Sequence, residues 1–226
     1  MPIQFLDHRL RFPDPRRADS EGLVAVGGDL SVPRLLLAYR SGIFPWTANP
    51  VTWWSPDPRG IFELDGLHIS RSLARVLRQE RFEIRLDSSF RAVMEGCARP
   101  ARGRRSTWIT AEFIEAYCEL HAQGYAHCLE CWQKGELVGG IYGVSVGGLF
   151  AGESMFHRVS DASKVALYHL IKHLRERGYV LFDTQMLTPT TEQLGAVNIS
   201  REEYLKRLKV AVDKECSFGE EDKEFL

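Results

Sequence analysis

Three polar side chains stand in apolar stretches of this sequence. Asp183 and Gln185 belong to an expected strand at 179–185, and their spacing of two residues puts both on one face of it. Glu153 is the one acidic or basic residue in the apolar stretch 137–156. A buried carboxylate costs free energy unless it is paired or has a role. Each of the three could have a purely structural role as a hydrogen-bonded or ion-paired group. If all three converge in one sheet, however, they would be typical of a catalytic or binding site.

Other catalytic patterns are missing from the sequence. The residues around Ser154 do not form a G-x-S-x-G elbow, and the seven histidines show no H-E-x-x-H spacing. There is no P-loop and no G-x-G-x-x-G. Cys128 and Cys131 form one C-x-x-C without a second ligand pair, and the expected strand would point them to opposite faces. These patterns therefore give no support for a metal site or a nucleotide cofactor, and the five cysteines predict no disulfide framework.

The charges of the chain are segregated although its net charge is −1. Residues 69–105 contain ten arginines and four acids, and residues 213–226 contain six acids and two lysines. Arg71, Arg75 and Arg78 fall on one stripe of an expected helix at 70–79. A basic segment in a neutral protein favours a polyanion surface, with nucleic acid as the leading candidate. The alternative is a solvated helix face.

The elements that must position these residues fall into two regions. Residues 1–60 are rich in proline, glycine and tryptophan, and we expect rigid surfaces rather than regular elements around Trp46 and at 53–59. Residues 61–226 mix strands and helices, which predicts an α/β or α+β domain. Its expected helices lie at about 70–79, 87–97, 110–123, 160–177 and 200–212, and its strands at about 82–86, 126–133, 136–146, 148–156 and 179–185.

Two further expectations concern the apolar stretch and the location of the protein. Gly147-Gly148 suits a hairpin turn, and we expect the other glycines of 137–156 to allow close approach of a ligand. No apolar run reaches the ~18 residues of a membrane span, and the first residues have no signal core. We expect a cytoplasmic protein without membrane contact, and a monomer.

Seven short blocks in order carry a resemblance to a known family. They are 22–30 (GLVAVGGDL), 42–46 (GIFPW), 53–59 (WWSPDPR), 68–72 (HISRS), 107–110 (TWIT), 152–156 (GESMF) and 183–185 (DTQ). Together they closely resemble the leucyl/phenylalanyl-tRNA–protein transferases, over about residues 10–210. The resemblance implies a small N-terminal domain and an acetyltransferase-like (GNAT-type) domain with a mixed sheet flanked by helices. It also implies transfer of leucine or phenylalanine, less often methionine, from aminoacyl-tRNA to proteins beginning with arginine or lysine, in the N-degron pathway, without metal or coenzyme.

The resemblance also implies roles for single residues. Asp183 and Gln185 match catalytic positions, and the aspartate would be either a general base or a positioning group. Glu153 would attract the cationic acceptor. Trp46 and Trp108 match positions that sandwich the terminal adenosine of tRNA. Arg71, Arg75 and Arg78 would contact tRNA phosphates. The aminoacyl side chain would enter a pocket formed by Ile141, Phe150, Met155, Leu170 and Leu174.

Two other functions stay open from the sequence. A coenzyme A-dependent N-acyltransferase on the same fold would need a glycine-containing pyrophosphate loop, and the corresponding segment 157–163 (HRVSDAS) has no glycine. A non-catalytic tRNA-binding module would explain the arginines and tryptophans, but it would leave Asp183, Gln185 and Glu153 without a purpose. The roles of the arginine-rich loop 99–105 and of the acidic tail are open, as is the preference among the amino acids.

Overall fold

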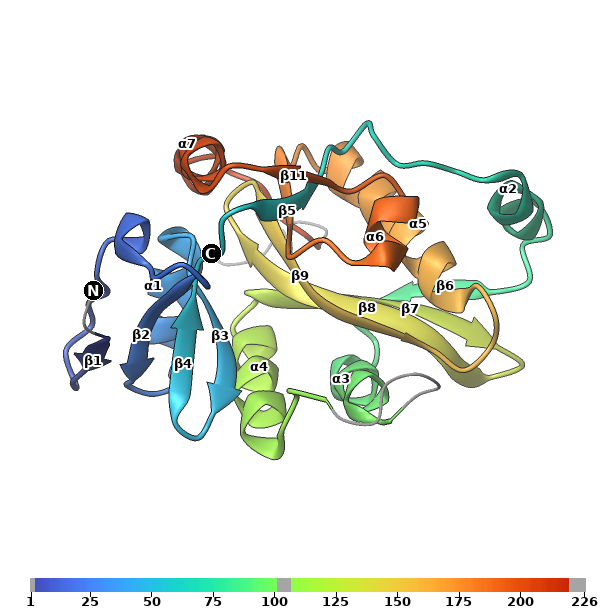
Figure 1. Ribbon diagram of the computed structural model, residues 1–226. Coiled ribbons are helices and arrows are strands. Elements are labelled where there is room, and N and C mark those ends of the chain that lie inside the picture. The colour runs from blue at the N-terminus through green and yellow to red at the C-terminus, as the bar shows by residue number, and fades with distance from the viewer. Residues whose placement is uncertain (1–2, 101–106, 220–226) are drawn as a thin grey trace, which may run out of the picture.

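Two separate β-sheets organise the chain in the computed structural model, which describes residues 3–100 and 107–219 (Figure 1). The smaller sheet has the order β1-β2-β4-β3 and the larger has the order β11-β5-β10-β9-β8-β7-β6. The strands of the smaller sheet are β1 (Gln4–Leu6), β2 (Leu23–Gly27), β4 (Val51–Trp54) and β3 (Phe44–Ala48). Those of the larger sheet are β11 (Val197–Ile199), β5 (Arg59–Phe62), β10 (Leu181–Gln185), β9 (Leu149–His157), β8 (Glu136–Val146), β7 (Ala126–Gln133) and β6 (Glu83–Leu86).

Helices pack on both faces of the larger sheet. All the helices of the described residues are η1 (Pro15–Arg17), α1 (Val32–Arg40), α2 (Arg71–Arg78), α3 (Phe90–Ala98), α4 (Ala111–Ala122), α5 (Ala162–Glu176), α6 (Pro189–Gln193) and α7 (Arg201–Val212). Figure 1 shows α3 and α4 below the sheet and α5 above it. Each face has its own apolar core: buried residues of α1, α3, α4 and α7 contribute to one, and those of α2 and α5 to the other.

The mixed α/β architecture that the sequence predicts is confirmed by the strand directions. β10 runs parallel to β9, and the other pairs of the larger sheet are antiparallel. The chain crosses from β9 to β10 through α5, as a parallel pair requires. Cys128 and Cys131 lie in opposite cores, as strand alternation predicts. The change of sheet occurs between Trp54 and Arg59; the domain boundary near residue 60 stays a prediction.

Most predicted elements of residues 61–226 form within a few residues of their expected bounds, but the aromatic and proline-rich segments do not behave as predicted. Trp46 lies in β3 and Trp53 and Trp54 lie in β4, so these segments are strands of the smaller sheet. β2, β5, α6 and β11 were also not expected. Short strands that contain or adjoin prolines show no clear alternation of apolar and polar residues, so the sequence does not reveal them. They are stabilised by pairing with neighbouring strands.

Gly139 and Gly143 of the β8–β9 hairpin serve packing within the protein, whereas Gly152 lines a cavity. Gly147 has a φ of 58°, which the predicted hairpin turn requires. A Cβ on Gly143 would lie 2.3 Å from the carbonyl oxygen of Ala151, and a Cβ on Gly139 would lie 2.6 Å from the Cβ of Ala162. The expectation that these glycines leave space for a substrate is therefore wrong for Gly139 and Gly143.

Candidate functional site

Asp183 is buried at the centre of the larger sheet and is paired with an arginine. Its side chain is 1% exposed, and β10 holds it between β5 and β9. Arg59 donates from Nε to Oδ1 at 2.9 Å and from Nη2 to Oδ2 at 2.6 Å. The Tyr204 hydroxyl donates to Oδ2 at 2.8 Å, and the Gln185 backbone N–H donates to Oδ1 at 2.8 Å. Both carboxylate oxygens of Asp183 are thus fully engaged by protein groups.

Glu153 is held differently, with one carboxylate oxygen engaged and the other not. Oε1 accepts hydrogen bonds from the Tyr39 hydroxyl and from Nε2 of Gln185, both at 2.7 Å. Oε2 is buried and has no hydrogen-bond partner within the described part of the chain. Burial is the largest influence on this carboxyl and raises its pKa to about 7, against the two hydrogen bonds, which lower it. Near neutral pH this carboxyl is therefore able to take up or release a proton.

Gln185 connects the two carboxylates. Its backbone N–H binds Asp183 and its side-chain amide binds Glu153. The residue has a φ of 63°, which is uncommon for a non-glycine residue, and the β10–β5 register shifts between Asp183 and Gln185. The two residues therefore do not continue one regular strand. The bulge turns the glutamine side chain toward Glu153 on the neighbouring strand β9.

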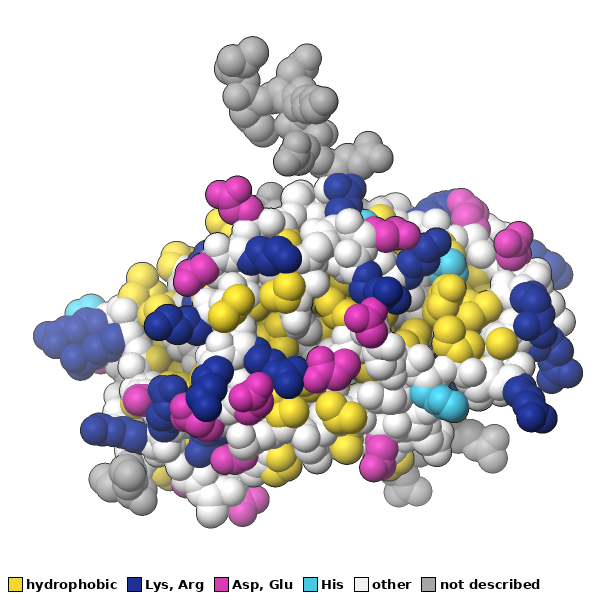
Figure 2. Space-filling view, turned by 90° about the horizontal axis from the view of Figure 1, so that it is seen from above, with side chains coloured by type: hydrophobic (Ala, Val, Ile, Leu, Met, Phe, Trp, Pro, Cys, Tyr) yellow, Lys and Arg dark blue, Asp and Glu magenta, His cyan; other side chains and the backbone are white. Residues whose placement is uncertain are grey.

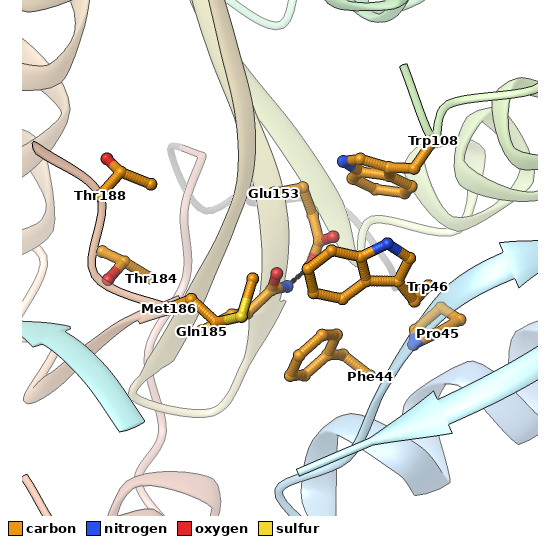
Figure 3. Close-up of a pocket in the computed structure, with 9 residues that line it drawn as sticks. All are labelled: Phe44, Pro45, Trp46, Trp108, Glu153, Thr184, Gln185, Met186 and Thr188. Atoms are coloured by element: carbon orange, nitrogen blue, oxygen red, sulfur yellow. Dashed lines mark hydrogen bonds between the residues drawn. The ribbon is translucent and has the colours of Figure 1, made fainter. Parts of the chain in front are cut away.

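Two cavities meet beside Glu153. The smaller, about 170 Å³, lies between β3, the end of β10 and the segment before α4. Figure 3 shows its tryptophans on one side and its threonines on the other, with Glu153 and Gln185 between them. Its walls are formed by Phe44, Pro45, Trp46, Trp108, Glu153, Thr184, Gln185, Met186 and Thr188. The larger cavity, about 600 Å³, shares Glu153, Thr184, Met186 and Thr188 with it and has an apolar floor that includes Ile141, Met155 and Phe182.

The structure brings together some of the predicted site residues and not others. Glu153, Gln185, Trp46 and Trp108 line the smaller cavity. Asp183 lies beneath it and lines neither cavity. Of the predicted side-chain pocket, Ile141 and Met155 line the larger cavity. The other three residues are fully buried in the apolar core and do not line it: Phe150, Leu170 and Leu174. These three residues belong to the apolar core on the α5 side of the sheet, and an apolar residue looks the same in a sequence whether it lies in a core or in a pocket.

The predicted arginine stripe forms as expected on α2 but lies away from both cavities. Ser70 caps this helix by accepting from the Leu73 N–H, and Leu73 and Val76 face the core. Arg71, Arg75 and Arg78 are exposed. Residues 101–106 of the arginine-rich loop and residues 220–226 of the acidic tail lie outside the described residues.

Several residues of the site were not found from the sequence. Arg59 and Tyr204 come from β5 and α7 and complete the Asp183 cluster. Tyr39 comes from α1, and its hydroxyl also contacts that of Tyr117 in α4. Arg59 begins an apolar strand, which indicates that it has a buried acidic partner. The sequence does not show which acid that is, because Asp183 lies 124 residues further along the chain. The tyrosines look like ordinary core residues in the sequence.

One group of potential metal ligands occurs among the described residues, and it is satisfied within the protein. Asp87, His121 and His127 offer ligand atoms within 4.8 Å of one another. However, Nδ1 of His127 contacts Asp87 at 2.7 Å and Nε2 contacts the carbonyl oxygen of Gly124 at 3.0 Å. Both ring nitrogens therefore already bind protein oxygens, and the group fits a structural link better than a metal centre.

Comparisons with known proteins identify the family. Residues 61–209 match the family described as "Leucyl/phenylalanyl-tRNA protein transferase", and residues 28–57 match the N-terminal domain of the same family. The chain belongs to the leucyl/phenylalanyl-tRNA–protein transferase family. Relatives with that name include one from Shewanella halifaxensis, 46% identical over 95% of this chain and 93% of the relative. Another, from Chromobacterium violaceum, is 51% identical over 88% and 87%.

Members of this family are named for transfer from aminoacyl-tRNA to protein, so the chain is an aminoacyltransferase. Among solved structures, L-PGS from Bacillus licheniformis has a TM-score of 0.43 and 15% identity, covering 74% of this chain and 54% of that one. A GCN5-related N-acetyltransferase-like protein from Streptococcus suis has a TM-score of 0.36 and 18% identity over 63% and 57%. Both scores are below 0.5, so neither likeness carries an argument about this chain. Across the described residues, no helix is both long and apolar enough for a membrane span.

Proposed function

We propose that this member transfers leucine or phenylalanine, and less often methionine, from aminoacyl-tRNA to the N-terminal arginine or lysine of acceptor proteins. The observation that carries this proposal is the position of Glu153 and Gln185 where an aromatic cavity meets a larger apolar one. An aminoacyl-tRNA end has the same two parts, an adenosine and an amino-acid side chain, joined at the reacting ester. No coenzyme is required, because the donor ester is already activated.

The donor end divides between the two cavities. The terminal adenine stacks with Trp46 and Trp108, since aromatic rings hold unpaired bases at a stabilisation of ~1–3 kcal/mol per base. The amino-acid side chain enters the larger cavity, against Ile141 and Met155. Methionine adapts its shape to more than one apolar side chain, which suits a pocket that accepts leucine, phenylalanine and methionine. The arginines of α2 contact phosphates of the same tRNA.

Glu153 receives the acceptor. An α-ammonium group has a pKa of about 8, so it must lose a proton before it attacks the ester. The pKa of Glu153 near 7 leaves enough carboxylate at neutral pH to bind the ammonium group at the wall of the smaller cavity and take one of its protons. The amine nitrogen then bonds to the ester carbonyl carbon. As the peptide bond forms, the ester C–O bond breaks, and the tRNA ribose oxygen leaves with the second proton that the amine nitrogen loses.

Asp183 and Gln185 have separate roles in this mechanism. The Gln185 side chain lies at the cavity wall and orients the carbonyl or the amine by hydrogen bonding. Asp183 has no free oxygen for a substrate, so it acts as a positioning residue that fixes the turn at Gln185. Of the two alternatives that the sequence leaves open for Asp183, this geometry favours the second.

The cellular role follows from the substrates. Aminoacyl-tRNA is present where translation occurs, which supports a cytoplasmic location, and no described cysteine forms a disulfide, as in most cytosolic proteins. Addition of a leucine or phenylalanine to an N-terminal arginine or lysine would mark the acceptor for degradation in the N-degron pathway. One domain pair carries both cavities, so we propose that a monomer is sufficient.

A transfer assay tests the proposal. Purified protein is incubated with tRNA carrying labelled leucine and with a peptide that begins with arginine, without ATP or coenzyme A. We expect label on the peptide, and none on a matched peptide that begins with glycine. A folded sample that moves label only when coenzyme A is present, or not at all, would refute the proposal.

A further inference from the structure

A third hollow lies on the opposite side of α5 from the two cavities of the site. It occupies about 630 Å³ between α2, the start of β6 and α5. Val165, Tyr168, His169 and Lys172 of α5 line it, whereas Leu167 of the same helix lines the larger cavity of the site. At about 100° per residue, the first four form one stripe and Leu167 faces the opposite way. We call this hollow the α2–α5 groove.

The rim of the α2–α5 groove is basic. Arg78, Arg81 and Lys172 line it against one acid, Glu80. Arg81 lies 4.0 Å from the carboxylate of Asp161 and Lys172 lies 3.8 Å from that of Glu176, so these two cations are partly balanced. Burial and the nearby charge of Lys172 lower the pKa of His169, so this histidine adds no charge at neutral pH. Arg78 continues the exposed arginine stripe of α2. Figure 2 shows Lys and Arg side chains gathered at the end of the molecule where α2 lies, beside an area of hydrophobic side chains. Arg78, together with the arginine stripe that it continues, therefore favours an anion as the occupant.

The floor of the groove is apolar and partly aromatic. Val76, Phe82 and Val165 contribute to it, and the guanidinium of Arg81 lies over the Phe82 ring at 5.4 Å. The Tyr168 ring stands at the edge, perpendicular to that of His169 at 5.1 Å. Phosphate-binding cations around an apolar, aromatic floor are the features with which proteins bind unpaired nucleotides. The volume is also in the range of small-ligand pockets.

We propose that the α2–α5 groove binds an unpaired nucleotide of the donor RNA, upstream of the adenosine held at Trp46 and Trp108. The base lies against Tyr168 and the apolar floor, and the flanking phosphates contact Arg78, Arg81 and Lys172. This inference rests on the proposed function, because it adds a second contact to the same RNA. Charge favours RNA over the acceptor protein, whose reacting end is cationic.

The test compares a complete donor with a minimal one. Leucyl-tRNA can reach both the site and the groove, whereas 3′-O-leucyl-adenosine can fill only the site. The variants are Tyr168→Ala, Tyr168→Phe, the double variant Arg78→Gln/Lys172→Gln, and a control, Lys209→Gln, which removes an exposed cation from α7. Direct binding of uncharged tRNA is measured in parallel over a range of salt concentrations, so that the groove is tested even if transfer fails.

We expect Tyr168→Ala to raise the KM for leucyl-tRNA roughly tenfold and to leave its kcat and all constants for the minimal donor unchanged. Tyr168→Phe keeps the ring and should behave like the unmodified protein. The double variant should reduce the slope of log K against log salt by roughly 1.5, from two phosphate contacts, and the control should not. Equal losses with both donors would make the groove residues structural. Unchanged tRNA binding in every variant would overturn the proposal, and would leave an acidic peptide as the occupant that fits the charges.

Discussion

The surroundings of Asp183 and of Glu153 differ although the two carboxylates are joined by one glutamine. Asp183 accepts four hydrogen bonds, two of them from the buried guanidinium of Arg59. Glu153 accepts two, both on one oxygen, and no described guanidinium or ammonium group binds it directly. A fully satisfied buried ion pair maintains a geometry, while a half-satisfied carboxyl with a pKa near 7 is suited to exchange a proton. In the proposed mechanism, Asp183 is therefore the structural carboxylate and Glu153 the reactive one.

The variant with the largest expected effect is Glu153→Gln. It should lower the transfer activity and raise the free energy of unfolding. Loss of the proton acceptor should reduce kcat/KM by roughly 10²–10⁴-fold. The pKa of Glu153 is raised from 4.5 to about 7 by folding, so the stability linked to this group is complete below pH 4.5 and is lost as pH rises through 7. At pH 8 the neutral glutamine avoids this loss, and the free energy of unfolding should rise by up to roughly 3 kcal/mol.

Single-turnover transfer and urea unfolding at pH 5 and pH 8 measure both effects of Glu153→Gln. The stability gain should be present at pH 8 and small at pH 5, where the carboxyl of the unmodified protein is already mostly protonated when folded. A variant that keeps its transfer rate would remove Glu153 from the chemistry.

Asp183→Asn should mainly lower the free energy of unfolding, in contrast to Glu153→Gln, which mainly lowers activity. The substitution leaves the guanidinium of Arg59 buried without its counter-charge, and breaking one partner of a buried pair costs about 3–5 kcal/mol. Urea unfolding measures this change. The double variant Arg59→Met/Asp183→Leu is the control, since an apolar pair of similar volume should recover much of the stability. If Asp183→Asn folded with undiminished stability but transferred no leucine, Asp183 would be the reacting group instead.

A smaller effect is expected from Tyr39→Phe, which removes one hydrogen bond to Glu153. That bond lowers the pKa of Glu153, so its loss should raise the pKa above about 7, by roughly one unit at most. The acidic limb of the pH profile of kcat/KM should move to higher pH by the same amount. Tyr117→Phe is the comparison variant: its hydroxyl contacts that of Tyr39 and also interacts with Glu153, but without the 2.7 Å hydrogen bond that Tyr39 donates, so its effect should be smaller. An acidic limb that stays in place would mean that another group titrates.

The sequence predicted those features of the fold and site that depend on residues close together in the chain. The helix Arg71–Arg78 and the hairpin around Gly147 follow from capping, periodicity and turn residues within a few positions. Asp183, Gln185 and Glu153 were recognisable as polar groups in apolar strands. The division of labour between them was not, because it depends on Arg59 and Tyr39, which reach the site from distant parts of the chain. The residues of the apolar cavity were predicted only in part: Ile141 and Met155 line it, but Leu170 does not. In a sequence, an apolar residue of a core cannot be told from one that lines a pocket.

The bond that Gln185 makes to each carboxylate has an evolutionary consequence. A substitution near Asp183 alters the turn at Gln185 and is therefore felt at Glu153, so substitutions at the two acids should be epistatic rather than independent. A lineage that drifts toward another acceptor or amino acid is then free to vary the cavity walls, such as Ile141 and Met186, but has to change Arg59, Asp183 and Gln185 together or not at all. We therefore expect the centre of the sheet to diversify more slowly than the cavity walls.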